Sequence, residues 1–202
     1  MTDHSAERVI AVYRRHGRDW AMLRGVQLVE RTWLDRFCGL LPDGADVLDI
    51  GCGSGVPMAR ELVRRGLAVT GIDAAPEMLA LFRANLPGTS SLVSDMRQLA
   101  LGKAFAGLLA WDSFFHLAPA DQRAMFARFR DHAAAGAALM FTSGPGYGET
   151  VGTLGGDALY HASLDPAEYR ALLDAAGFRV IDHVVEDPQC GDRTIWLAQR
   201  HA

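Results

Sequence analysis

Alternating glycines after a short apolar run are the first feature of this sequence that suggests chemistry. They lie in Gly51-Cys52-Gly53-Ser54-Gly55, directly after the apolar run at 46–50. Glycines at this spacing permit a tight turn and let a ligand approach the backbone closely, and Pro57 suits the start of a following helix. Alone, the pattern is equally typical of an ordinary strand-to-helix turn.

An acidic residue follows the glycine loop at a spacing that suits a ribose. Asp73 lies 22 residues after Gly51, at the end of the apolar run 69–72. A carboxylate there can accept both hydrogen bonds from a ribose diol. It can instead cap the helix that begins near Pro76. The third glycine follows the second by two residues, not three, so the loop lacks the phosphate fingerprint of nicotinamide-binding domains.

Polar and aromatic residues follow two further apolar runs. Asp95 and Met96 come directly after 91–94, and the segment 111–116, which ends in His116, follows the run at 107–110. Parallel strands bring their carboxyl ends to one edge of a sheet, and ligands of open α/β folds bind in the crevice outside that edge. We therefore expect these side chains and the glycine loop to line one pocket.

The elements that must position these residues alternate along the chain. Apolar patterning predicts strands at 46–50, 68–72, 91–94, 107–111, 137–142, 178–186 and 193–199, and helices at 57–65, 76–85, 120–132 and 165–176. This alternation predicts a doubly wound α/β fold, with helices on both faces of a mostly parallel sheet. The last two strands are joined too closely for a parallel return, so we expect them to form an antiparallel hairpin.

Two segments fall outside this alternation. From residue 5 to residue 41, apolar residues recur at helical spacing with a break near Gly17, which predicts two helices. Residues 144–163 contain six glycines and few large apolar side chains, so we expect an irregular lid loop there. We treat the chain as a single domain, 1–202, in which 1–41 forms an N-terminal helical cap.

Composition limits the partners that we expect. The chain has 20 basic and 24 acidic residues, a net charge of −4 and no run of basic residues, so we expect no nucleic-acid partner. Cys38, Cys52 and Cys190 form no CxxC pair, so we expect neither a disulfide framework nor a metal site. The acidic N-terminus and the lack of a long apolar stretch predict a cytoplasmic protein without a membrane partner.

Together, these motifs resemble those of the class I S-adenosylmethionine-dependent methyltransferases, and among them the small bacterial type that acts on small molecules. Residues 47–55 are similar to the glycine motif of that family, 71–73 to its acidic motif, and 94–96 to its adenine-contacting motif. The resemblance implies a seven-stranded Rossmann-like sheet of order 3-2-1-4-5-7-6 with the last strand antiparallel. It also implies methyl transfer from S-adenosyl-L-methionine, with S-adenosyl-L-homocysteine as product.

The resemblance further implies a set of cofactor contacts. The backbone of Gly51 and Gly53 would face the methionine portion, Asp73 the ribose hydroxyls, and Asp95 with the backbone of Met96 the adenine. We expect the rest of the cofactor site to consist of Asp49, Cys52, Gly55, Ala74, Trp111 and, from the N-terminal helices, Tyr13. The side chain of Cys52 is expected to be a buried filler and not a nucleophile.

Catalysis in this class rests largely on alignment, because methyl transfer from a sulfonium is an in-line displacement. Where the acceptor carries a proton, a base helps, and His116 is the first candidate for it, followed by His161. Each histidine can instead have only a structural role. We expect Phe115, Tyr147 and Tyr160 to contact the substrate.

Two other classes of protein share part of this pattern. A non-catalytic module that binds S-adenosylmethionine would keep the glycine loop, and a nicotinamide-dependent oxidoreductase would keep the acidic residue, although the glycine spacing disfavours it. An open cavity beside the methyl position favours an enzyme, whereas one filled by Phe115 or Tyr147 favours a binding module. The motifs specify neither the acceptor atom, which is oxygen, nitrogen, sulfur or carbon, nor whether the protein is a monomer or a homodimer.

Overall fold

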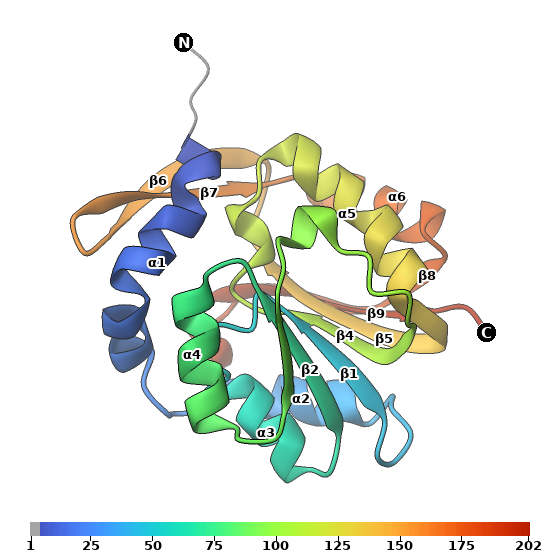
Figure 1. The fold of residues 1–202 in the computed structure, drawn as a ribbon. Coiled ribbons are helices and arrows are strands. Elements are labelled where there is room, and N and C mark those ends of the chain that lie inside the picture. Colours follow the sequence, from blue (N-terminus) through green and yellow to red (C-terminus); the bar gives the residue numbers. More distant parts are fainter. Residues whose placement is uncertain (1–4) are drawn as a thin grey trace.

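A single twisted sheet organises the molecule (Figure 1). The computed structural model describes residues 5–202, so the first four residues of the expected cap lie outside it. The sheet has seven strands in the order β3-β2-β1-β4-β5-β9-β8. Its strands are β1 (Asp46–Ile50), β2 (Ala68–Asp73), β3 (Ser90–Val93), β4 (Phe105–Ala110), β5 (Ala133–Ser143), β8 (Phe178–Asp187) and β9 (Arg193–Arg200).

The strand directions confirm the predicted topology. β1 to β5 pair in parallel, and β9 pairs antiparallel with both β5 and β8. The sequence order of strands six and seven is thus reversed in space, and the last strand is the antiparallel one. The doubly wound α/β fold and the expected terminal hairpin are both confirmed.

Helices cover the two faces of the sheet because successive side chains of each strand point to opposite sides. Leu48 and Ile50 of β1 pack into one core with α5 (Pro119–His132) and α6 (Pro166–Ala175). Val47, which precedes Leu48 and points to the opposite face, packs into a second core. That core is covered by α2 (Arg31–Cys38), α3 (Met58–Arg64) and α4 (Pro76–Asn85).

The parallel register brings the chemically interesting loops to one edge. Asp49 of β1 lies opposite Gly71 of β2 and Leu109 of β4, so these three strands end at the same level. Two short 3₁₀ helices follow strands at that edge, η1 (Met96–Gln98) after β3 and η2 (Phe114–His116) after β4. The expectation that these loops meet is therefore confirmed by the backbone.

The N-terminal cap differs from the prediction at one point. Helix α1 (Ser5–Arg24) runs through Gly17 without a break, and it ends just before Gly25, whose φ is 63°. Gly17 lies where α1 crosses α4, and a Cβ at this position would collide with the Sδ atom of Met78. The predicted break was wrong because a glycine that permits close helix packing has the same sequence signature as one that ends a helix.

Residues 144–163 do not form the irregular loop that we expected. They contain an antiparallel hairpin of β6 (Gly148–Leu154) and β7 (Asp157–Ser163), turned by Gly155 and Gly156, which both have positive φ. Most of β6 is exposed, so its sequence lacks the apolar alternation that reveals a strand. The prediction missed the hairpin because backbone pairing, and not side-chain burial, defines this strand.

Helix α1 packs on this hairpin and not on the main sheet. Val9 and Val12 of α1 form a small third core with hairpin residues that include Leu154, Leu159 and Tyr160. At the hairpin turn, Asp157 accepts hydrogen bonds from Arg15 at 2.7 Å and pairs with His16 at 2.8 Å. Figure 1 shows α1 and the hairpin side by side. Across residues 5–202, no helix is long and apolar enough to cross a membrane.

We predict that Gly71→Ala lowers the free energy of unfolding by about 1 to 3 kcal/mol, the usual cost of overpacking a core. A Cβ at this buried position of β2 would lie 2.8 Å from Sγ of Cys52 and from ring atoms of Phe82. Urea unfolding followed by circular dichroism measures the change. Gly146→Ala is the control, because a Cβ there meets nothing within 4 Å. Equal stability of the two variants would contradict this account of the packing.

Candidate active site

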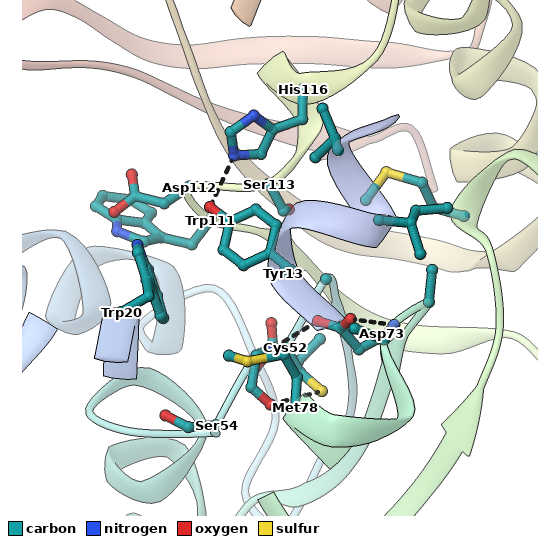
Figure 2. A pocket seen from close by; sticks show the side chains of 18 of the residues that line it. Tyr13, Trp20, Cys52, Ser54, Asp73, Met78, Trp111, Asp112, Ser113 and His116 are labelled. Atoms are coloured by element: carbon teal, nitrogen blue, oxygen red, sulfur yellow. Dashed lines mark hydrogen bonds between the residues drawn. The ribbon is translucent and has the colours of Figure 1, made fainter. Parts of the chain in front are cut away.

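A pocket opens at the carboxyl edge of the sheet, between the glycine loop, η1, η2 and the overlying helix α1 (Figure 2). The structure brings together in its lining all the residues that we expected to contact a cofactor. They are Tyr13, Asp49, Gly51, Cys52, Gly53, Gly55, Asp73, Ala74, Asp95, Met96 and Trp111. Trp20 and Met78 also line the pocket. Their contacts with a cofactor remain predictions.

The glycine loop has a backbone that only glycine adopts easily. Gly51 has a φ of 73°, and any side chain there would collide with Ser113, whose hydroxyl donates a 2.7 Å hydrogen bond to the carbonyl of Ile50. Gly53 has a φ of 55°. The loop therefore presents bare backbone to the pocket, as the sequence predicted.

Asp73 connects the glycine loop to the loop after β2. Its Oδ2 accepts a hydrogen bond from the backbone N–H of Gly53 at 2.9 Å, and its Oδ1 accepts one from Ala75 at 2.8 Å (Figure 2). The capping role that we considered for Asp73 is thus present. Because Asp73 also lines the pocket, the structure leaves its carboxylate within reach of a ligand.

A second carboxylate, Asp49, lies almost fully buried beside Asp73. Burial, with a further contribution from the charge of Asp73, raises the pKa of Asp49 to about 7. Burial also raises the pKa of Asp73. In the described part of the chain, neither carboxylate is paired with an arginine or lysine. This end of the pocket therefore favours a ligand that carries positive charge.

Tyr13 and His116 form a hydrogen-bonded pair on the pocket wall (Figure 2). Nδ1 of His116 lies 2.8 Å from the carbonyl of Tyr160, which can only accept, so Nδ1 carries the proton. Nε2 is then an acceptor, and the hydroxyl of Tyr13 donates to it at 3.0 Å. Burial lowers the pKa of His116 to about 3, so the imidazole is neutral.

The other histidine candidate lies outside this pocket. The ring of His161 packs against those of His116 and Phe115, at 4.8 and 5.3 Å between centroids. His161 and Phe115 line a second cavity of about 550 Å³, which the backbone of the hairpin encloses on one side. One residue of η2, Phe115, thus faces the second cavity, while its neighbour His116 faces the first.

The two tyrosines expected to contact substrate line neither cavity. Tyr147 is 66% exposed. The side chain of Tyr160 is buried in the small core under α1, and its hydroxyl donates a 2.6 Å hydrogen bond to Glu149. Strand pairing in the hairpin turns Tyr160 toward α1 and away from the second cavity, so neither position supports the expected substrate contacts, which stay predictions.

Sequence reasoning missed four charged residues at the far end of the first pocket. Arg24 and Asp112 line it, and each is tied to a partner behind the wall. Arg24 donates to Glu30, and Arg193 binds both carboxylate oxygens of Asp112 at 2.8 to 3.0 Å. No local sequence pattern predicts these contacts, because Arg193 and Asp112 are 81 residues apart in the sequence.

At this site, the described residues include neither a thiol suited to be a nucleophile nor a cluster of metal ligands. Cys52 is buried in the glycine loop, and burial raises the pKa of its thiol well above the ordinary value, which disfavours a reactive thiolate. Between residues 5 and 202, no group of three histidine, cysteine, aspartate or glutamate side chains is arranged to hold a metal ion.

Comparisons with known proteins agree with the motif analysis. Residues 47–136 match a family model described as a methyltransferase domain. An uncharacterized methyltransferase of Mycobacterium tuberculosis is 44% identical over 63 residues, which are 31% of this chain and 26% of that protein. The ubiquinone biosynthesis O-methyltransferase of Pseudomonas aeruginosa is 36% identical over 77 residues, 38% of this chain and 32% of that protein. The matched part thus spans about a quarter to a third of these relatives.

Solved structures extend the likeness to nearly the whole fold. The 1,6-didemethyltoxoflavin-N1-methyltransferase of Burkholderia thailandensis has a TM-score of 0.73 at 19% identity, covering 98% of this chain and 91% of that one. An amino pentose methyltransferase of Micromonospora echinaspora has a TM-score of 0.69 at 24% identity, covering 88% and 93%.

The strand order and these structural neighbours define the fold as that of the class I S-adenosylmethionine-dependent methyltransferases. Within that fold, residues 47–136 are the part that matches the methyltransferase-domain model. This segment extends from β1 to the start of β5 and contains the glycine loop, Asp73, Asp95 and His116. The predicted fold is therefore confirmed, and the matched segment agrees with the family that the motifs resemble.

We predict that His116 stays neutral, with its proton on Nδ1, from pH 8 down to about pH 4, because its pKa lies near 3. Heteronuclear NMR of ¹⁵N-labelled imidazoles reads both the charge and the tautomer, and the His116→Asn variant assigns the signal. Unfolded histidine titrates near pH 6.5, so this residue costs folding stability as the pH falls below that value. A His116 signal that titrates near pH 6.5 would contradict the buried geometry.

Proposed function

We propose that this protein is an S-adenosylmethionine-dependent methyltransferase that acts on a small molecule. The observation that carries this proposal is that two carboxylates, Asp49 and Asp73, lie beside a glycine loop of positive φ without an arginine or lysine partner among the described residues. S-adenosylmethionine carries positive charge on its sulfonium and ammonium groups and has no phosphate. A pocket with two carboxylates at its glycine loop and no arginine or lysine paired with them suits this ligand and opposes a dinucleotide pyrophosphate.

The pocket residues divide between the parts of the cofactor. Asp73 would accept from the ribose hydroxyls while it keeps the glycine loop in place. Asp95 is already held by Arg97, through its backbone N–H and its guanidinium, so Asp95 is fixed in position at the adenine end. Met96 begins η1 beside it, where its backbone would meet the adenine.

When bound, the cofactor supplies a methyl group on an electrophilic sulfonium. The chain contributes positioning. His116 is too weak a base at a pKa of about 3 to take a proton directly at neutral pH. Its neutral Nε2 instead fixes the hydroxyl of Tyr13, so that the oxygen lone pairs of Tyr13 face the pocket and orient the acceptor group.

The second cavity suits the methyl acceptor. It adjoins the cofactor pocket through the ring contact of Phe115 with His116, at 4.8 Å between centroids. Its lining contains one ionisable acid, Glu149, and neither arginine nor lysine. Such a lining favours a neutral or cationic acceptor over a phosphorylated or carboxylated one. Glycine backbone and the aromatic ring of Phe115 in the lining suit a flat molecule.

The alternative of a non-catalytic binding module is less well supported. The space beside His116 is filled neither by Phe115, which lines the open second cavity, nor by the exposed Tyr147. Net charge and the scattered arginines support a small molecule over a nucleic acid as partner. A cytoplasmic location remains part of the proposal.

We predict that Asp73→Ala weakens binding of S-adenosylhomocysteine by about 1.5 to 3 kcal/mol, the range for hydrogen bonds to a charged group. Isothermal titration calorimetry with S-adenosylmethionine, S-adenosylhomocysteine and NADH measures this, and NADH should give no heat. The control Asp174→Ala removes an exposed carboxylate on α6. Unchanged affinity in Asp73→Ala would remove Asp73 from the ribose site, and binding of NADH alone would overturn the proposed cofactor.

We predict that Gly148→Leu, whose side chain enters open space at the second cavity, lowers methyl transfer at least about tenfold. The assay measures S-adenosylhomocysteine formed with small phenols, amines and carboxylic acids, of which the acids should react least. Affinity for S-adenosylhomocysteine should stay within about twofold, because the substitution lies outside the cofactor pocket. Val151→Leu, on an exposed position of the same strand, is the control. Full activity of Gly148→Leu would place the acceptor elsewhere.

A further inference from the structure

Four charged side chains form a continuous chain of contacts from the end of α1 to the loop after β4. Arg24, the last residue of α1, donates to Oε1 of Glu30. The same oxygen lies 3.8 Å from Nη2 of Arg193. Arg193 in turn donates through Nε and Nη2 to both carboxylate oxygens of Asp112. The chain alternates in sign, with two arginines and two carboxylates.

Only the first and the last of these four side chains reach the pocket. Arg24 and Asp112 line it, whereas Glu30 and Arg193 lie behind the wall. Figure 2 shows Asp112 beside Trp111 on the pocket wall, and Trp20 also lines the pocket. The pocket thus presents one cation and one anion here, on two elements that are far apart in sequence.

This arrangement lowers the stability of the fold, which argues that it has a function beyond packing. Glu30 is fully buried, and within residues 5–202 its Oε2 has no hydrogen-bond partner. A buried carboxylate with an unsatisfied oxygen opposes folding unless its charge is compensated. Asp112 has a φ of 47°, in the left-handed region that is strained for residues other than glycine. Strain of this kind gathers at ligand sites.

We infer that Glu30 and Arg193 are positioning residues that hold Arg24 and Asp112 as an oppositely charged pair for the amino-acid end of the cofactor. This inference rests on the proposed function. The amino-acid end is a zwitterion, so Arg24 would donate to its carboxylate and Asp112 would accept from its ammonium group. The four-residue chain is neutral overall, and a zwitterion binds to it without adding net charge.

The division of charges along the pocket supports this assignment. At the nucleoside end, Asp95 is occupied by Arg97 and Asp73 by two backbone N–H groups. Two arginines, Arg24 and Arg97, line the pocket. Because Arg97 is paired with Asp95, Arg24 is the arginine available to a ligand carboxylate. Arg24 donates through Nη2 to Glu30 and through Nη1 to the carbonyl of Gln27, which fixes the guanidinium and leaves Nε and one hydrogen on each Nη to bind a ligand.

A different role for these four charged side chains would be to anchor α1, with no contribution to ligand recognition. The two roles separate when two ligands are compared. S-adenosylhomocysteine carries the amino-acid end, whereas 5′-methylthioadenosine has the same nucleoside and thioether sulfur without it. A loss of structure would weaken binding of both ligands, but a loss of positioning would weaken only the first.

Isothermal titration calorimetry with both ligands tests the inference on the full chain. Arg193→Met should lower the affinity for S-adenosylhomocysteine at least about tenfold and that for 5′-methylthioadenosine by less than about twofold. Arg193→Lys should recover part of the loss, because it keeps the charge but not the two-point contact. Arg36→Gln is the matched control, since it removes an arginine–carboxylate pair with Asp182 that does not line the pocket.

Equal losses for the two ligands in Arg193→Met and Arg193→Lys, or an unchanged affinity for S-adenosylhomocysteine, would overturn the inference and leave the proposed function intact. If the wild-type protein bound neither ligand, the proposed function would fail and the inference with it. Binding of 5′-methylthioadenosine by each variant also verifies that its nucleoside site is folded.

Discussion

The carboxylate of Asp73 is the interaction on which the site depends. It receives the N–H of Gly53 from one loop and that of Ala75 from another, and so joins the turn after β1 to the start of α4. Without it, the glycine loop would lose the bond that holds its backbone open toward the pocket. The adjoining Asp49 adds a second carboxyl group, whose pKa is raised to about 7 by burial and by the charge of Asp73.

Around this fixed centre, the remaining parts of the site come from separate layers of the fold. The main sheet supplies the glycine loop, η1 and η2, which the parallel register places at one edge. Helix α1 and the hairpin supply Tyr13 and the carbonyl of Tyr160, which together hold His116. The antiparallel strand β9 supplies Arg193 from the side opposite β2. The site is therefore assembled from contacts that come from several different parts of the fold.

The sequence predicted those features that depend on residues close together in the chain. The glycine loop, Asp73 and the alternation of strands and helices each have local signatures, and the structure places them as expected. Gly17 was misread, because its reason is a contact with Met78 on another helix. The hairpin was missed, because the strand β6 has few buried side chains. The contacts of Arg193 with Asp112 and of Arg24 with the buried Glu30 had no sequence signal, because tertiary packing alone brings these partners together.

The small core that joins α1 to the hairpin has a mechanical consequence. Val9 and Val12 pack with hairpin residues apart from the two cores of the sheet, and Asp157 ties the hairpin turn to α1 through two further contacts. Movement of α1 away from the glycine loop would carry the hydroxyl of Tyr13 away from His116 at the same time. If the hairpin followed, the imidazole would also lose its carbonyl partner. The position of α1 and the hydrogen bonds of His116 are therefore coupled, so the arrangement of Tyr13, His116 and the carbonyl of Tyr160 exists only while α1 lies over the glycine loop.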